Sequence, residues 1–270
     1  MRRILFRLGV AIALTVLASG CASRSGPQPL LWAHAHNDYE HARPLLDALE
    51  HGFANIEADI WLVEGKLLVA HDRKSVKPER TLEVLYLEPL RARVRENGGR
   101  VWRGGPTLTL LVDVKSEARA TYAALEAVLA GYAEILTVYE AGKEKTGAVT
   151  VVVSGNRTPE DMAAKARRYS ALDGRSTELD STAPATLYPW ISENWTKLSK
   201  WKGEGALPEA DRATLRNWVD RAHAQGRKIR FWNFPETPEA WRILTEAGVD
   251  VIGTDHLARL RDFLREEKGL

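Results

Sequence analysis

Two acidic residues, Glu57 and Asp59, lie two positions apart in residues 54–62, which read ANIEADIWL. Apolar and polar positions alternate along this segment, a pattern typical of a β-strand whose side chains point to opposite faces in turn. The two carboxylates would therefore share a face, bounded by Ile56 and Ile60. They would repel each other and lose hydration unless a cation or a proton lay between them. The pattern predicts a metal or proton-transfer site, and a solvated face of an edge strand is the alternative.

Five of the seven histidines fall in the same early part of the chain. His71 follows a second apolar run, residues 66–70, so a hairpin would bring it close to the carboxylate pair. His36 follows the apolar run at residues 30–33, where we expect the first strand to end. Two imidazoles and two carboxylates would then converge from strand ends. Such a set suits general acid and base catalysis around a metal-bound oxyanion.

The order of these residues resembles a known superfamily of phosphodiesterases. The resemblance rests on three short motifs, namely His36-Asn37, Glu57-x-Asp59 and His71-Asp72. They are similar to those of the glycerophosphodiester phosphodiesterases and of the wider phosphatidylinositol-specific phospholipase C-like superfamily, which includes the spider sphingomyelinases D. The form of the first motif, HNDY, looks most like the branch of the altered-inheritance-of-mitochondria proteins.

Later segments extend the resemblance to about residue 260. Asp113 and Lys115, after the apolar run at residues 107–112, look like the third metal carboxylate and the phosphate-neighbouring lysine of the superfamily. Trp232 matches a position that walls the substrate pocket, and residues 253–255, GTD, look like the end of a late barrel strand.

The resemblance implies a metal-dependent phosphodiester hydrolase. Glu57, Asp59 and Asp113 would hold one divalent cation, and this oxygen-rich set favours Mg²⁺ or Ca²⁺ without distinguishing them. His36 and His71 would act as general base and general acid, in an order that the sequence leaves open.

The substrate would be a glycerophosphodiester or a phospholipid head group, in contact with Asn37, Lys115 and Trp232. Asn37-Asp38 stand where the glycerophosphodiesterases usually have Arg-Gly, so the substrate pocket can differ from theirs. A catalytically inactive barrel that serves as a binding lipoprotein of the cell envelope is the alternative function.

Two other barrel enzymes share single features with this chain. His34-Ala35-His36 resembles the first motif of the zinc amidohydrolases, but no histidine occurs between Asp72 and Arg221 to complete a zinc site. Lys115 could form a Schiff base, but such an enzyme does not need a carboxylate cluster.

The fold predicted from the sequence is α/β, a single (β/α)₈ TIM barrel over residues 30–270. Segments that favour strands and helices alternate from residue 30 onward, as in parallel sheets with helical crossovers. The expected strands are residues 30–35, 54–62, 107–114, 148–154, 170–172, 185–192, 228–234 and 249–254. The expected helices are residues 44–51, 81–97, 118–130, 159–168, 208–225, 238–247 and 257–266. In such barrels the functional residues lie at the carboxyl ends of the strands.

The first 20 residues read as an export signal, with three arginines before an apolar run at residues 8–17. Cys21, the single cysteine, follows small residues as in bacterial lipoprotein signals. We therefore expect residues 1–20 to be a signal peptide, Cys21 to be lipidated and residues 21–29 to form a tether. The predicted location is the bacterial cell envelope, anchored to the membrane by lipid.

The overall charge gives no indication of a polyanionic partner. The chain has 38 Lys and Arg against 36 Asp and Glu, a formal net charge of +2. Because nucleic-acid-binding domains carry a clear basic excess, we expect no nucleic acid partner. We expect the protein to be a monomer.

Overall fold

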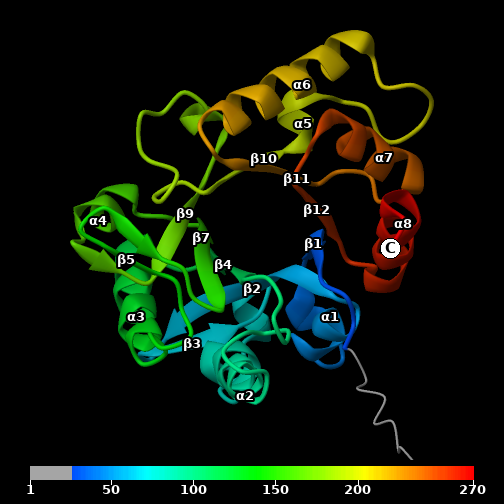
Figure 1. The fold of residues 1–270 in the computed structure, drawn as a ribbon. Coiled ribbons are helices and arrows are strands. Elements are labelled where there is room, and N and C mark those ends of the chain that lie inside the picture. Colours follow the sequence, from blue (N-terminus) through cyan, green and yellow to red (C-terminus); the bar gives the residue numbers. More distant parts are fainter. Residues whose placement is uncertain (1–25) are drawn as a thin grey trace, which may run out of the picture.

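A closed barrel of parallel strands organises the protein in the computed structural model, which describes residues 26–270. Within these residues eight strands form the barrel, and pairing of β1 with both β12 and β2 closes it. Figure 1 shows the strands as an inner ring with helices outside it. The predicted (β/α)₈ barrel is therefore confirmed. The barrel strands are β1 (Leu30–Ala35), β2 (Phe53–Val63), β4 (Leu108–Val114), β7 (Val149–Gly155), β9 (Ser170–Gly174), β10 (Trp190–Asn194), β11 (Lys228–Trp232) and β12 (Val251–Thr254).

Helices cover the outside of this ring and follow the predicted order. In α7 the Thr237 side chain accepts a hydrogen bond from the Ala240 N–H, Pro238 occupies the first turn and Gly248, with φ of 86°, follows the last residue. These are the usual signals for the start and the end of a helix. The helices are α1 (Leu46–Glu50), α2 (Glu88–Glu96, preceded by a π-helical turn at Glu83–Leu87), α3 (Ala118–Ala130), α4 (Pro159–Ala164), α5 (Trp195–Leu198), α6 (Glu209–Ala224), α7 (Pro238–Ala247) and α8 (Leu257–Lys268).

The structure departs from the prediction at residues 165–168, which are not helical. The helix α4 ends at Ala164, and β8 (Arg167–Arg168) pairs with β5 (Val138–Glu140) instead. Together with β6 (Lys143–Lys145), these strands make a small antiparallel sheet outside the barrel. Strands of two or three residues are too short for an alternating pattern, so the sequence did not indicate this sheet.

The strand β3 (Lys66–Val69) confirms the predicted hairpin. It runs antiparallel to β2, with Ile60 opposite Val69. A hydrogen bond from the Ala70 N–H to the Asp59 carbonyl extends the pairing by one step. His71 is therefore held beside the carboxyl end of β2.

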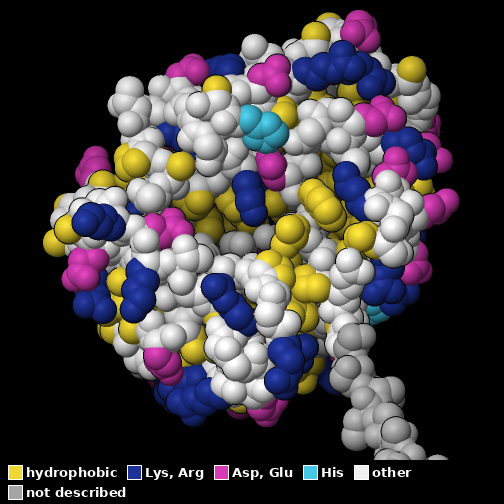
Figure 2. All heavy atoms as spheres, in the orientation of Figure 1, with side chains coloured by type: hydrophobic (Ala, Val, Ile, Leu, Met, Phe, Trp, Pro, Cys, Tyr) yellow, Lys and Arg dark blue, Asp and Glu magenta, His cyan; other side chains and the backbone are white. Residues whose placement is uncertain are grey.

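The barrel interior is packed with apolar side chains below its polar end. Leu111, Val152, Trp190 and Val251 form a buried cluster drawn from four strands. This layer makes the barrel a solid core, as in other barrels of this kind. On the face of the molecule seen in Figure 2, acidic and basic side chains are interspersed around the rim, and hydrophobic side chains line a central hollow. Among residues 26–270, no helix is both long enough and apolar enough to span a membrane.

Candidate active site

A cavity of about 460 Å³ opens at the carboxyl ends of the barrel strands. The predicted residues that line it are His36, Asn37, Glu57, Asp59, His71, Asp113, Lys115 and Trp232. The structure thus brings together every predicted site residue except Cys21, which lies outside the described residues. A larger cavity of about 850 Å³ lies beside the β5–β6 hairpin and contains none of them.

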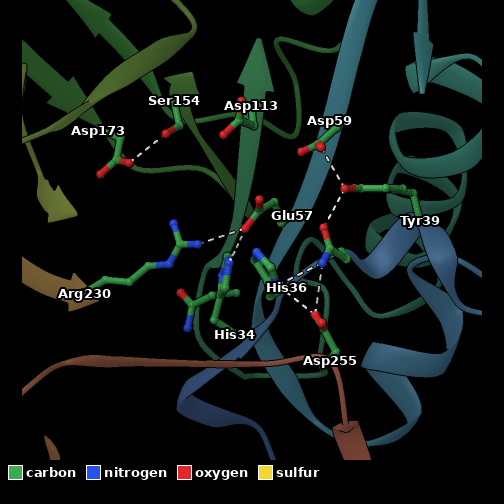
Figure 3. Close-up of polar contacts among 12 residues, drawn as sticks. His34, His36, Tyr39, Glu57, Asp59, Asp113, Ser154, Asp173, Arg230 and Asp255 are labelled. Atoms are coloured by element: carbon green, nitrogen blue, oxygen red, sulfur yellow. Dashed lines mark hydrogen bonds and ion pairs between the residues drawn. The ribbon is translucent and has the colours of Figure 1, made fainter. Parts of the chain in front are cut away.

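Three carboxylates from two adjacent strands meet in this cavity. The register of β2 and β4 pairs Asp59 with Asp113 and places Glu57 one step lower on the same face. Ligand atoms of the three side chains lie within 4.8 Å of one another. Figure 3 shows the three carboxylates turned toward a common space. The predicted sharing of one face by Glu57 and Asp59 is confirmed.

Glu57 is buried and remains ionised because two partners compensate its charge. Its Oε2 accepts hydrogen bonds from His34 Nε2 at 2.7 Å and from Arg230 Nη2 at 3.0 Å. Burial acts to raise the pKa of Glu57, but the Arg230 guanidinium and the His34 hydrogen bond outweigh it and hold the pKa well below its usual range. Both contacts fall on Oε2, so Oε1 lies outside them.

Asp59 and Asp113 share one cation, the ammonium group of Lys115. Lys115 Nζ lies 3.1 Å from Asp59 Oδ2 and 3.2 Å from Asp113 Oδ1. Burial raises the pKa of Asp59 to about 6, with further contributions from the charges of Glu57 and Asp113. Burial also raises the pKa of Asp113. The cluster therefore holds more negative charge than its own cations neutralise.

The donor set fits a hard divalent cation. Three carboxylates of one cavity provide the oxygen ligands that Mg²⁺ and Ca²⁺ prefer. In addition, Asp59 Oδ1 is buried without a hydrogen-bond partner among the described residues, although buried polar atoms are normally paired. A cation bound between Glu57, Asp59 and Asp113 would satisfy this oxygen.

His36 is oriented by a carboxylate that directly follows the last strand of the barrel. Its Nδ1 lies 2.7 Å from Asp255 Oδ1, which also accepts a hydrogen bond from Asn37 Nδ2 at 3.2 Å. Burial lowers the pKa of His36, but the hydrogen bond to Asp255 and the charge of Glu57 outweigh it, so the pKa is raised. With Nδ1–H bound to Asp255, Nε2 is the nitrogen that can exchange a proton in the cavity.

His71 is held from the other side of the cavity by the hydroxyl of Tyr39. This hydroxyl lies 3.1 Å from His71 Nδ1, 2.6 Å from Asn37 Oδ1 and 2.7 Å from Asp59 Oδ2. The imidazole is more than half exposed, and its Nδ1 also lies 3.2 Å from Asp59 Oδ2. As in His36, these contacts of the His71 ring with the described residues involve Nδ1 and not Nε2.

Comparison with known proteins agrees with this geometry. Residues 28–101 match the family model described as AIM6-like phosphodiesterase domain. The resemblance predicted from the HNDY motif is confirmed. A relative from Eremothecium gossypii, named Altered inheritance of mitochondria protein 6, is 28% identical over 274 residues, which cover 85% of this chain and 68% of the relative. A protein of the same name from Lachancea thermotolerans is 30% identical over 275 residues and covers 83% of this chain and 63% of the relative.

The fold is also that of a solved structure. A glycerophosphodiester phosphodiesterase from Parabacteroides distasonis superposes with a TM-score of 0.55 over 89% of this chain and 99% of that chain, at 13% identity. The residues that match the AIM6-like model are therefore part of a TIM barrel.

The predicted location in a bacterial cell envelope is wrong. The relatives that match this chain are yeast and other fungal proteins named for mitochondrial inheritance. An arginine-rich start followed by an apolar run is not specific to bacterial lipoproteins. Cys21 and the signal-like residues 1–20, on which the prediction rested, lie outside the described residues.

Three polar residues that contact the predicted site residues, His34, Tyr39 and Arg230, were not predicted as site residues, and Asp255 was predicted only as part of the end of a late barrel strand. His34 is fully buried and contacts Glu57. Arg230 stands between Ile229 and Phe231 in a buried strand, and a charged residue in that position is a signal for a functional site. Tyr39 belongs to the HNDY motif itself. The role of Asp255 depends on closure of the barrel.

Two tryptophans frame the mouth of the cavity. Trp232 is the last residue of β11, two positions after Arg230, and its side chain is 39% exposed. Trp61, on β2, donates a hydrogen bond from Nε1 to the Ala70 carbonyl at 3.0 Å. Trp61 was not predicted, because it occupies an apolar strand position that core packing also explains.

Proposed function

We propose that this protein is a metal-dependent phosphodiester hydrolase that acts on glycerophosphodiesters or phospholipid head groups. The observation that carries the proposal is the convergence of His36, His71 and three carboxylates on one cavity. Each component has a defined task in phosphodiester cleavage.

Glu57, Asp59 and Asp113 would hold the cation. Bound there, Mg²⁺ or Ca²⁺ would polarise a non-bridging oxygen of the phosphate. Lys115, already between two of these carboxylates, is positioned to donate hydrogen bonds to the charge that develops on the phosphate. Arg230 keeps Glu57 ionised and thereby ready to serve as a ligand.

His36 and His71 carry out the proton transfers. One imidazole takes the proton of the attacking hydroxyl, and the other protonates the alcohol that leaves. Both rings are bound through Nδ1, so each transfers its proton through Nε2. Water is one possible nucleophile. A hydroxyl of the substrate itself is the other, and it would give a cyclic phosphate as the first product.

The test is hydrolysis of bis(p-nitrophenyl) phosphate and of glycerophosphocholine by the purified full chain, with EDTA, Mg²⁺ or Ca²⁺. We expect turnover that requires a divalent cation and that His36→Ala and Glu57→Gln abolish. His223→Ala is the matched control, because His223 lies on α6 and pairs with Asp250 outside the cavity. A folded protein without turnover on either substrate would instead support the inactive-barrel alternative.

A further inference from the structure

A third cation, Arg175, lines the cavity at a distance from the carboxylates. It follows β9, whose place in the barrel order is four strands from β1 in either direction. Arg175 therefore lies on the side of the cavity opposite His36. The carboxylate partner of Arg175 is Asp173, which is not one of the three carboxylates of the proposed cation site.

Buried partners fix the guanidinium of Arg175. Its Nη1 donates to Asp173 Oδ2 at 2.8 Å and to the Gly174 carbonyl at 3.0 Å, and its Nη2 donates to Ser154 Oγ at 3.0 Å. Asp173 is fully buried and Ser154 is 3% exposed. A guanidinium carries five N–H donors in a planar fork, and the second N–H of Nη2 and that of Nε lie outside these contacts. Arg175 thus presents rigidly held donors to the cavity.

The charge of Arg175 is balanced differently from that of the other cations. Lys115 and Arg230 pair with the carboxylates of the proposed metal site, whereas Arg175 pairs with Asp173, beneath it. Asp173 balances the charge of Arg175, and Glu178, 3.9 Å from Arg157 Nη1, balances the neighbouring guanidinium. These two pairs leave no excess positive charge to attract a further anion. A neutral oxygen that accepts a hydrogen bond from Arg175 does not require excess charge.

An acceptor lines the same cavity after the end of β7, the strand that pairs with β9. Asn156 also lines the cavity and donates through Nδ2 to the carbonyls of Ser116 at 2.9 Å and Lys115 at 3.3 Å. These contacts fix the amide and leave its oxygen, Oδ1, as an acceptor. A donor and an acceptor that line one cavity from the ends of adjacent strands can bind the same hydroxyl group.

We propose that Arg175 and Asn156 form a subsite for the hydroxyl groups of the substrate's alcohol, so that Arg175 selects diesters of a polyol such as glycerol. This inference rests on the proposed phosphodiesterase function and specifies its substrate. Arg175 would contact the alcohol and not the reacting phosphate. Its removal should therefore change substrate preference and leave phosphate chemistry in place.

The test compares two diesters that differ in one hydroxyl group, 2,3-dihydroxypropyl p-nitrophenyl phosphate and 2-hydroxypropyl p-nitrophenyl phosphate. Both keep the 2-hydroxyl that could attack the phosphate, so a difference between them reports recognition and not the choice of nucleophile. We expect the full chain to prefer the dihydroxypropyl diester and Arg175→Ala to reduce that preference in kcat/KM by about tenfold or more, since a site built to bind a hydroxyl discriminates strongly against its absence. Turnover of the 2-hydroxypropyl diester should change less. Arg175→Ala removes the cation that pairs with the buried Asp173. The double variant Asp173→Asn/Arg175→Ala, which also removes the buried charge, is therefore measured in the same assay.

Arg157→Ala is the control for disturbance of the loop after β9. Arg157 donates to the Asp173 carbonyl and does not line the cavity of Arg175. Equal losses on both diesters, or no loss on either, would overturn the inference. A loss confined to 2-carboxyethyl p-nitrophenyl phosphate would also overturn it, in favour of an anion. No turnover of any diester by the unmodified chain would be a failure of the proposed function itself.

Discussion

His36 and Asp255 are 219 positions apart in the chain, yet Nδ1 of the imidazole and Oδ1 of the carboxylate lie 2.7 Å from each other. His36 directly follows β1, and Asp255 directly follows β12. The contact therefore exists only because β1 and β12 pair and close the barrel. The orientation of His36, the proposed acid–base residue, therefore depends on closure of the barrel.

Asp255→Asn should weaken catalysis and shift its pH dependence. The hydrogen bond to Asp255 raises the pKa of His36 against the effect of burial, so its loss should lower that pKa. The limb of the kcat/KM profile that reports His36 should move to lower pH, and kcat should fall by about tenfold or more. Asp262→Asn, at an exposed carboxylate of α8, is the control. A reduced kcat with an unmoved profile would contradict this role for Asp255.

Gly155→Ala should damage the carboxylate cluster. A Cβ at this position would collide with Asp113 Oδ1 and with the Val114 carbonyl, and Gly155 has a φ of +69°. Gly226→Ala is a matched control, because Gly226 has the same φ with open space around it. Both variants incur backbone strain of about 1–2 kcal/mol. Only Gly155→Ala should also reduce cation binding in a calorimetric titration, and equal behaviour of the two variants would disprove the expectation.

Barrel strands such as β4 and β7 could be predicted because they are buried, mostly apolar runs with a clear end. The prediction of residues 107–114, for example, differs from β4 by one residue. The polar residues of β10 (Trp190–Asn194) made its bounds harder to predict, and the predicted strand began five residues early. The small sheet of β5, β6 and β8 could not be predicted, because Lys143–Lys145 reads as a polar loop. Such short strands depend on tertiary pairing more than on local preference.

The site residues also fall into those that a local pattern predicts and those whose contacts depend on the fold. Glu57 and Asp59 were predictable because the two-residue repeat of a strand determines which side chains share a face. The contact of Arg230 with Glu57 joins residues 173 positions apart across the barrel interior. No local pattern encodes that distance or the closure that it requires. The charge of Arg230 in an apolar run and the motif that contains Asp255 are visible in the sequence, but their contacts with Glu57 and His36 emerge only from the fold.

Cation binding should release protons near pH 6. Burial and the neighbouring carboxylates raise the pKa of Asp59 to about 6, so below this pH the free site holds a proton that a cation must displace. Affinity for Mg²⁺ or Ca²⁺ should therefore fall as the pH decreases through about 6. Calorimetry in two buffers of different ionisation enthalpy should detect proton release at about pH 5.5 and little at about pH 8. An affinity that is constant over this range would contradict the assignment of Asp59 as a ligand.

Asp38, in the turn that carries Asn37 and Tyr39, should make the protein less stable as the pH rises. Its Oδ2 accepts hydrogen bonds from the Leu45 N–H at 2.5 Å and from the Tyr86 hydroxyl at 2.9 Å, but the side chain is fully buried. Burial raises its pKa to about 7 from an unfolded value of 3.8. Between these two values the folded chain keeps a proton that the unfolded chain has lost. The free energy of unfolding should therefore decrease as the pH increases from about 4 to about 7, and the penalty is complete above that range.

Asp38→Asn should remove this component, because the amide oxygen can still accept the hydrogen bonds from Leu45 and Tyr86 and carries no charge. Urea unfolding at about pH 5 and pH 8 measures the change for both proteins. Asp59 and Asp113 also have raised pKa values and add a decrease of the same sign in both proteins, so the difference between the two decreases isolates Asp38. The variant should lose less stability between these pH values than the unmodified chain does. Equal losses would mean that Asp38 is ionised in the fold throughout this range, with its charge compensated by the hydrogen bonds alone.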